Sequence, residues 1–445
     1  MNIDILSNYI VNANQLDKTL FDEYDVKRGL RHADGRGVLV GLTHVADVHA
    51  YTLDQDKPKP VAGRLTYRGV NIEDLTQTAV AERRFGFEET SFLLLFGHLP
   101  NREELEYFEE LLGEKRMLDP KFMKSNILDH PSKNVINAMA TSVLSLYTLD
   151  ENPECNSIKN VLQQSILLIA TFPTLMVYAY QAYLHYHQNE SLVIHKPRPD
   201  LTTAENILYM LRPDQSYTPL EATLLDLSLI IHAEHGGGNN STFATHLITS
   251  ATTDTYSVVA AALGSLKGTR HGGASLKVLE MFNNIKENVT DWEDDRAIRE
   301  YLLKIVNKEA FDRSGLIYGI GHAIYTVSDP RAVVLKQYAR QLAIEKELEH
   351  EFLLHAKIEE LAPEILNEVK PHQNKQMCAN VDFYSGFVYS MLNIPEELFI
   401  PLFAVARIVG WTAHRMEEIV NEGKIIRPAY KSVIELLDYV SIENR

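Results

Sequence analysis

The chain has 445 residues, of which 45% are hydrophobic and 23% are charged, an ordinary composition for a globular protein with room for two domains. Its 43 lysines and arginines are outnumbered by 60 aspartates and glutamates, which gives a formal net charge of −17. This balance argues against nucleic acid or an anionic membrane surface as a general partner. An anionic small molecule remains compatible with the sequence if arginines gather locally around it.

The two cysteines, Cys155 and Cys378, stand in unrelated contexts without a CxxC pattern. They argue against a disulfide framework or a cysteine zinc site and favour a reducing, cytoplasmic location. No signal peptide is expected, because the first residues lack a basic segment followed by an apolar core. Residues 160–189 carry no charged side chain but contain Pro173. We interpret them as a buried helix broken at this proline, not as a membrane span.

Strand signals are confined to the first part of the chain. Residues 36–51 are rich in valine with rough alternation and follow Asp34-Gly35, and residues 63–69 add a second extended piece. This pattern predicts a short β ribbon. From Glu88 onward the apolar spacing is helical, which makes the fold all-α apart from the ribbon.

Two helix starts carry clear capping signals. Asn101 precedes Glu104 by three positions, and Thr218 stands three before Glu221 with Pro219 between them. Both arrangements are typical of a helix N-terminus. The second predicts an apolar central helix over residues 220–235 that the following glycines stop. Further helices are predicted over residues 133–149, 157–187, 201–211, 255–267, 274–286, 331–349, 352–368 and within 395–420.

Histidines near helix ends are the first candidates for chemistry. His232 and His235 have the i, i+3 spacing of a helical metal chelate, but the HExxH zinc-protease pattern is absent. We expect His232 to pack in the core. His235 is expected on the last turn of its helix, where the helix dipole favours the charged ring and a carboxylate can be held.

His271 lies just before a predicted helix, where the N-terminal potential favours a neutral ring that donates an N–H. His322 follows two glycines in Tyr-Gly-Ile-Gly-His-Ala. Asp382 stands between Val381 and Phe383, and apolar surroundings raise a carboxyl pKa toward that of a general base near neutral pH. Arg331, Arg407 and Arg427 are the arginines that, if they converge, suit a dicarboxylate.

In this order and spacing the motifs resemble the citrate synthase family. The resemblance runs from Tyr67-Arg-Gly-Val-Asn-Ile-Glu-Asp-Leu to Arg427-Pro, and is strongest in residues 232–274, 319–331 and 380–386. It implies a large helical domain of residues 1–273 and 385–445. It also implies a small mobile helical domain of residues 274–384 that closes over bound substrate.

The family condenses acetyl-CoA with oxaloacetate and hydrolyses citryl-CoA to citrate and CoA. By resemblance, Asp382 is the base that removes the methyl proton of acetyl-CoA, and His271 donates a hydrogen bond to the thioester oxygen. His322 polarises the oxaloacetate carbonyl. The residues implied to hold the oxaloacetate carboxylates are His235, Arg331, Arg407 and, from the partner subunit of a homodimer, Arg427.

The sequence also offers candidates for the CoA side of the site. The candidate CoA-binding residues are Leu316, Ile317, Tyr318, Gly319, Gly321 and Lys375. The family often has a base a few positions after the Gly-His motif, whereas this chain reads Ala-Ile-Tyr-Thr-Val-Ser there. No metal and no cofactor are expected, since acetyl-CoA is a co-substrate.

Two alternatives remain at this point. A 2-methylcitrate synthase that uses propionyl-CoA has the same motifs, because one sequence does not reveal the acyl pocket. A helical metal-binding or scaffold protein would instead use His232, His235 and His246.

Overall fold

A computed structural model describes residues 3–32, 36–54, 57–369 and 376–444. They divide into two compact units, residues 1–43 and residues 44–445. The first unit contains α1 (Ile3–Ala13), α2 (Thr19–Glu23) and a short 3-10 turn at Arg28–Leu30. The predicted division at residues 274 and 384 lies inside the second unit and stays a prediction.

The β ribbon occurs near the predicted position but begins later. The strands β1 (Ala46–Asp54) and β2 (Lys57–Tyr67) pair antiparallel with Ala46 opposite Tyr67, and the two-residue β3 (Val70–Asn71) adds to β2. The valine-rich stretch of residues 38–43 was expected in a strand and is not, so that expectation is wrong. In the absence of a ladder partner, hydrophobic alternation does not make a strand there.

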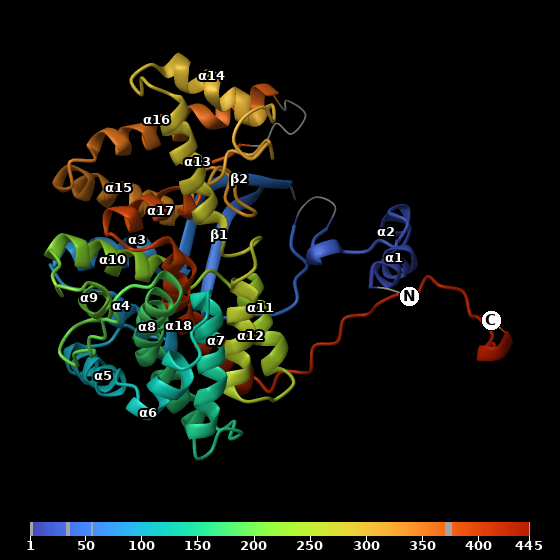
Figure 1. Ribbon diagram of the computed structural model, residues 1–445, viewed down its shortest axis with the longest axis horizontal. Coiled ribbons are helices and arrows are strands. Elements are labelled where there is room, and N and C mark those ends of the chain that lie inside the picture. Colours follow the sequence, from blue (N-terminus) through green and yellow to red (C-terminus); the bar gives the residue numbers. More distant parts are fainter. Residues whose placement is uncertain (1–2, 33–35, 55–56, 370–375, 445) are drawn as a thin grey trace. The chain divides into compact units, whose positions relative to one another are not determined.

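The rest of the second unit is helical, which confirms the all-α prediction (Figure 1). Its helices before the candidate site are α3 (Ile72–Ala81), α4 (Phe87–Phe96), α5 (Arg102–Lys115), α6 (Pro120–Phe122), α7 (Val135–Leu146), α8 (Ile158–Gln188) and α9 (Thr203–Leu211). Those that carry or flank it are α10 (Pro219–His232), α11 (Asn240–Thr249), α12 (Thr255–Leu266), α13 (Ala274–Asn288), α14 (Asp295–Val306), α15 (Pro330–Glu345), α16 (Glu349–Val369), α17 (Val381–Met391) and α18 (Phe399–Val420).

Both predicted capping boxes are present. The Asn101 and Thr218 side chains accept from the backbone N–H of Glu104 and Glu221, and each glutamate side chain accepts in return from the cap residue's N–H. Each box satisfies two helix-terminal donors, and a cap of this kind is worth about 1 kcal/mol. The capped α10 is thereby fixed at its start, and it leads directly into the candidate site.

The helix α8 runs without a break through Pro173, so the predicted interruption is wrong. A proline inside a helix removes one hydrogen bond at a cost of roughly 3 kcal/mol. Burial offsets this, because side chains on both sides of Pro173 lie in the core and α8 packs against α18, α7, α5 and α9. By length and composition α8 alone among the described helices could cross a membrane, but 83% of its most apolar window is buried in the protein.

Figure 1 shows α14 packed on α16 at one end of the second unit and α7 packed on α12 at the other. The helices α10, α15, α17 and α18 contact one another through their pairs α10–α18, α10–α15 and α15–α17. One continuous hydrophobic core joins these elements. The candidate site residues come from this middle layer and the loops beside it.

Candidate active site

The helix α10 ends at His232, three residues earlier than predicted. The Tyr67 hydroxyl lies here between the Ile230 carbonyl and the Glu234 N–H, the two groups that a continuing helix would pair with each other. It donates to the Ile230 carbonyl oxygen at 3.0 Å and accepts from the Glu234 N–H at 3.3 Å. A side chain that inserts between residues i and i−4 stops the helix. Glu234 and His235 therefore lie beyond the helix in a segment without regular secondary structure, and the next residue, Gly236, has φ 82°.

The expected charged state of His235 is wrong. The ring is buried, and burial, followed by the charges of Arg331, His322 and Arg407, holds the pKa of His235 well below its usual value. Lying beyond the end of α10, it also lacks the expected place on the last helical turn. Its Nε2 has no hydrogen-bond partner among the described residues, and its ring lies 5.3 Å from that of His322. His235 is therefore neutral, and its Nε2 is available to a ligand.

His322 is oriented by its own loop. Its Nδ1 accepts the backbone N–H groups of Ile324 and Tyr325, both at 3.1 Å, and its ring stacks on Tyr325 at a centroid distance of 4.8 Å. Because Nδ1 accepts, the ring hydrogen of the neutral form lies on Nε2. The loop therefore fixes a tautomer that donates from Nε2.

Backbone hydrogen bonds join the Gly319–Gly321 turn to the segment before Asp382. Gly321 N–H donates to the Cys378 carbonyl at 2.7 Å, Asn380 N–H donates to the Gly319 carbonyl at 2.8 Å, and Ile320 pairs with Ala379 as an isolated bridge. Gly319 has φ 81°, and a Cβ there would lie 2.8 Å from the Phe383 ring. Only glycine permits this approach, which places the His322 motif beside the start of α17.

Asp382 occupies the first turn of α17, whose cap is Asn380. Burial raises the pKa of Asp382 to about 6; the Arg331 charge opposes this rise and the Asp329 charge adds to it. This confirms the expected effect of apolar surroundings. A carboxylate with this pKa is ionised at neutral pH and remains basic enough for proton abstraction.

Arg331 is held by Asp329, the cap of α15, two residues before it. Arg331 Nε and Nη2 donate to the two oxygens of Asp329 at 3.0 and 2.7 Å. Asp329 Oδ2 also accepts the Val381 N–H at 3.2 Å, at the start of the helix that carries Asp382. One buried carboxylate therefore ties the candidate substrate arginine to the candidate base.

Arg407 on α18 is fully buried. Its Nε donates to the His232 carbonyl at 2.7 Å, and its guanidinium lies 4.6 Å from the Phe403 ring centre. Nη1 and Nη2 have no hydrogen-bond partner among the described residues. Burial lowers the pKa of Arg407 to about 10, while the charge of the buried Glu234 acts to raise it. A buried fork of two donors is an arrangement that a carboxylate can complete.

His271 lies in the turn between α12 and α13. Its Nε2 lies 3.1 Å from the Ser241 hydroxyl, whose oxygen accepts the Trp411 ring N–H at 3.1 Å. Burial, followed by the Arg407 charge, lowers the pKa of His271 to about 4. The expected neutral ring is confirmed, although burial rather than the helix end is its main cause.

Among the described residues, no hydrogen bond or ion pair joins Arg427, Leu316 or Tyr318 to this group. Arg427 is exposed on the segment after α18, where the Ile426 N–H donates to the Ser250 hydroxyl. In the candidate CoA segment Leu316 is exposed, Ile317 is buried, and the Tyr318 hydroxyl donates to Asp312 at 2.7 Å. Lys375 lies outside the described residues.

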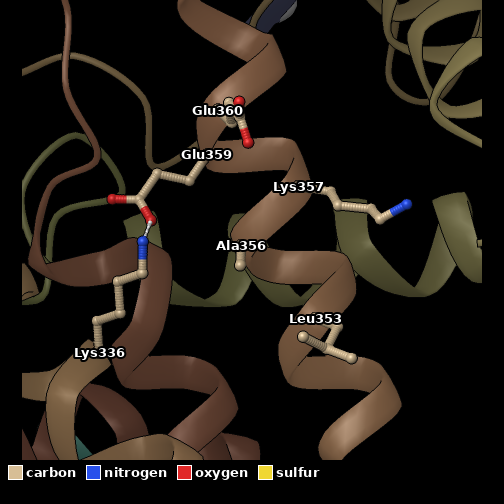
Figure 2. Close-up of a pocket in the computed structure, with 6 residues that line it drawn as sticks. All are labelled: Lys336, Leu353, Ala356, Lys357, Glu359 and Glu360. Atoms are coloured by element: carbon tan, nitrogen blue, oxygen red, sulfur yellow. Dashed lines mark hydrogen bonds and ion pairs between the residues drawn. The ribbon is translucent and has the colours of Figure 1, made fainter. Parts of the chain in front are cut away.

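Three surface hollows formed by described residues are lined by none of the predicted site residues. Figure 2 shows one of about 460 Å³ beside α16, where Lys336 donates to Glu359 at 2.5 Å and Lys357 points elsewhere. It contains none of the predicted residues. The described part of the chain also has no cluster of three metal-ligating side chains, and both ring nitrogens of His246 are engaged by Glu418 and His414.

Sequence reasoning missed three supporting residues. Asp329 was visible in the Asp-Pro-Arg motif, where an aspartate before a helical proline is a cap that can also reach the arginine. Glu234 lies next to His235, and a carboxylate inside an apolar histidine-rich segment signals a buried counter-charge. Tyr67 gave no local signal, because its partners are more than 160 residues away.

The geometry thus combines a carboxylate base, three histidines and two buried arginines. Such a set can bind a dicarboxylate, remove a weakly acidic proton and donate to a developing oxyanion.

Comparisons with known proteins identify the family of the chain. The family profile described as citrate synthase, C-terminal domain, matches residues 33–429. Citrate synthase from Synechocystis sp. is 34% identical over 82% of this chain and 84% of its own length. The Haloferax volcanii citrate synthase is 31% identical over 95% of this chain and 99% of its own length. A 2-methylcitrate synthase from Shewanella oneidensis is 31% identical over 86% and 90%.

Among solved structures, Pyrobaculum aerophilum citrate synthase superposes with a TM-score of 0.74 at 28% identity, covering 92% of this chain and 94% of that one. The citrate synthase from Thermotoga maritima superposes with a TM-score of 0.71 at 30% identity, covering 94% of this chain and 99% of that one. With most of the sequence matched and the all-α fold shared, this chain is an enzyme that belongs to the citrate synthase family.

Proposed function

We propose that this enzyme condenses acetyl-CoA with oxaloacetate and hydrolyses the resulting citryl-CoA to citrate and CoA. The observation that carries this proposal is the pairing of a base of raised pKa, Asp382, with the open guanidinium fork of Arg407. The first suits a weakly acidic carbon acid and the second suits a carboxylate substrate. The family assignment supports both substrates.

The chemistry follows from the protonation states. Asp382 removes a proton from the methyl group of acetyl-CoA, and the N–H of neutral His271 stabilises the thioester oxygen as the enol forms. The nucleophilic carbon then attacks the oxaloacetate carbonyl carbon and breaks the C–O π bond. The oxygen, which accepts a hydrogen bond from His322 Nε2, takes up one proton in place of the one that Asp382 removed and becomes the hydroxyl of citryl-CoA. General-base catalysis contributes roughly 10²–10⁴-fold, and a well-placed oxyanion donor adds about 3–4 kcal/mol. Water finally cleaves the thioester, so no cofactor is consumed.

Oxaloacetate is held in this scheme by His235, Arg331 and Arg407, with Arg427 of the partner subunit completing the site. A homodimer is supported by the segment of residues 421–441 that carries Arg427, which forms no helix or strand. Its Ile434, Leu436 and Leu437 are 78%, 102% and 82% exposed. Exposed apolar side chains of this kind are typical of a segment that packs on another chain.

The segment of residues 316–321, together with Lys375, is proposed to bind CoA. Closure of residues 274–384 over bound oxaloacetate is proposed to exclude water until the carbon–carbon bond has formed. The reducing conditions that two free cysteines favour are consistent with a cytoplasmic enzyme.

The direct test follows thiol release by the purified protein with oxaloacetate and acetyl-CoA. The expected result is CoA release that requires both substrates, and a folded protein that releases none would refute the proposal. The similarity to a 2-methylcitrate synthase keeps propionyl-CoA as a second candidate substrate. The ratio of kcat/KM for the two thioesters decides between them.

The role of Arg427 has its own test. Arg427→Ala should raise the oxaloacetate KM, because one of the donors to a carboxylate is lost. Dimers mixed with Asp382→Ala subunits should regain a fraction of the activity, since one of the two sites in a mixed dimer then has both residues. If exchanging dimers regain none, Arg427 acts within its own chain.

A further inference from the structure

One buried side chain packs beside three of the residues proposed to act on oxaloacetate, and the proposed reaction gives it no role. This residue is Tyr325, which is 0% exposed. Its ring centroid lies 4.8 Å from that of His322 and 5.6 Å from that of His235. The Arg331 guanidinium lies 5.9 Å from the same centroid, within the range of a cation–π contact. The three partners come from different segments of the chain, and they meet at Tyr325.

The three rings of Tyr325, His322 and His235 pack against one another as a triangle. The centroids of His235 and His322 lie 5.3 Å apart, so each ring is next to both others. His322 and Tyr325 stack with an interplanar angle of 27°. The His235 ring stands across this stack, at 83° to His322 and 72° to Tyr325. Stacked and edge-to-face arrangements are the ones that aromatic rings prefer.

The orientation of the His235 ring depends on this packing. Its Nε2 has no hydrogen-bond partner among the described residues that could hold it. His322, by contrast, is also held through Nδ1, which accepts the Ile324 and Tyr325 N–H groups. Tyr325 therefore acts on His322 through both its backbone and its ring, and on His235 through its ring.

The strand β2 packs against the edge of the Tyr325 ring. A Cβ on Gly63 would lie 2.5 Å from Tyr325 Cδ1 and closer still to the Ser328 carbonyl oxygen. The Gly63 N–H donates to this carbonyl oxygen and to the Ser328 hydroxyl, both at 3.2 Å. Only glycine lets the strand approach so closely. The β ribbon thereby holds the loop that carries Tyr325 in place.

The hydroxyl of Tyr325 is not needed for this support. It is buried and has no hydrogen-bond partner among the described residues, an arrangement that lowers stability. Burial raises the pKa of Tyr325, so the hydroxyl stays protonated. Phenylalanine would keep the ring and remove the unpaired group. Substitutions can therefore test the ring and the hydroxyl separately.

We propose that Tyr325 is a positioning residue whose ring sets the angle between His235 and His322, so that both histidines act on one oxaloacetate molecule. The inference rests on the proposed function, and Tyr325 itself does not touch the substrate. Without the ring, the His235 side chain is free to turn and His322 loses its stacking partner. Misplacement of a reacting group by about 1 Å costs roughly 10²-fold in rate.

The test compares Tyr325→Leu with Tyr325→Phe in the full-length protein. Calorimetry gives the oxaloacetate Kd, steady-state assays give kcat and the KM of each substrate, and thermal unfolding gives stability. Tyr325→Leu should raise the oxaloacetate Kd and KM by roughly 10- to 100-fold and leave the acetyl-CoA KM, measured at saturating oxaloacetate, unchanged. Tyr325→Phe should keep the wild-type constants with an equal or higher melting temperature.

Two results would overturn the inference. The first is a folded Tyr325→Leu protein whose oxaloacetate Kd stays within about twofold of the wild type, far below the expected change. The second is a loss of binding in Tyr325→Phe as large as in Tyr325→Leu, because the hydroxyl and not the ring would then be responsible.

A matched control is Tyr338→Leu. Tyr338 is also a buried tyrosine, and it lies on α15, the helix that carries Arg331. The substitution removes the same atoms from the core and should lower the melting temperature without changing the oxaloacetate Kd. If it weakens binding as much as Tyr325→Leu, general loss of packing explains the effect and the inference is overturned.

Tyr325→Met covers the case in which Tyr325→Leu does not fold. Methionine is flexible and fills irregular spaces in a core, but it has no flat ring. The same loss of oxaloacetate binding is expected, and a folded variant with the wild-type Kd would overturn the inference. A folded wild-type protein that binds no oxaloacetate would instead refute the proposed function itself.

Discussion

Replacing Asp382 with asparagine should abolish most of the activity and at the same time stabilise the fold. Asparagine has nearly the same shape but cannot accept a proton from a carbon acid. The loss of general-base catalysis should lower kcat by roughly 10²–10⁴-fold. Oxaloacetate binding should persist, because the base acts on the other substrate.

The gain in stability comes from the pKa of Asp382, which burial raises from 3.8 to about 6. Folding then disfavours the charged carboxylate above pH 6, at a cost of about 3 kcal/mol for a shift of about two units. The sign follows from proton binding: between the unfolded and folded pKa values the folded state holds more protons, so stability falls as pH rises through this window. Asp382→Asn removes the cost at pH 7 and changes little below pH 4.

Thermal unfolding at the two pH values and steady-state assays check both halves of this prediction. Asp329→Asn is the control, and its expected effect on stability is the opposite. The pKa of Asp329 is lowered, because Arg331 outweighs the effect of burial. It should destabilise the protein at pH 7. If Asp382→Asn lowers the melting temperature at pH 7, Asp382 is not a desolvated carboxylate. If the variant keeps kcat within tenfold of the wild type, Asp382 is not the base.

Three further variants test individual contacts. His271→Ala should lower kcat by about 10²–10³-fold as an oxyanion donor is lost, with oxaloacetate Kd unchanged in calorimetry; a weakened Kd would assign it to the other substrate. Gly410→Ala would place a Cβ into Glu234 Oε2 and 2.6 Å from the Ala233 carbonyl; it should cost about 1–3 kcal/mol in urea unfolding and raise the oxaloacetate KM. Thr218→Ala should cost about 1 kcal/mol through its lost cap with KM unchanged, and a changed KM would mean that the start of α10 positions the site.

Sequence patterns predicted the helices best where local chemistry decides them. The capping boxes at Asn101 and Thr218 follow from side chains within three residues of the backbone groups they satisfy. The raised pKa of Asp382 was also predictable, because its apolar neighbours are adjacent in sequence. These features depend on short-range contacts that one sequence contains in full.

The errors share a different cause, because tertiary contacts decided the outcome. The end of α10 depends on the Tyr67 hydroxyl, which arrives from β2 and shifts His235 off the helix. Pro173 is tolerated because packing against neighbouring helices outweighs the lost hydrogen bond. No local pattern encodes either partner, so neither the protonation state of His235 nor the continuity of α8 could be deduced.

The backbone hydrogen bonds between Gly319–Gly321 and residues 378–380 also constrain where residues can be inserted into the chain or deleted from it. A single residue inserted between Gly319 and His322, or between Ala379 and Asp382, would displace His322 or Asp382, the residues proposed to be catalytic, by about 3.3 Å relative to its partner. Insertions within the α16 region, Glu349–Val369, leave this bridge in register. Length variation among natural or designed variants is therefore expected to be absent from the two short segments that these hydrogen bonds join.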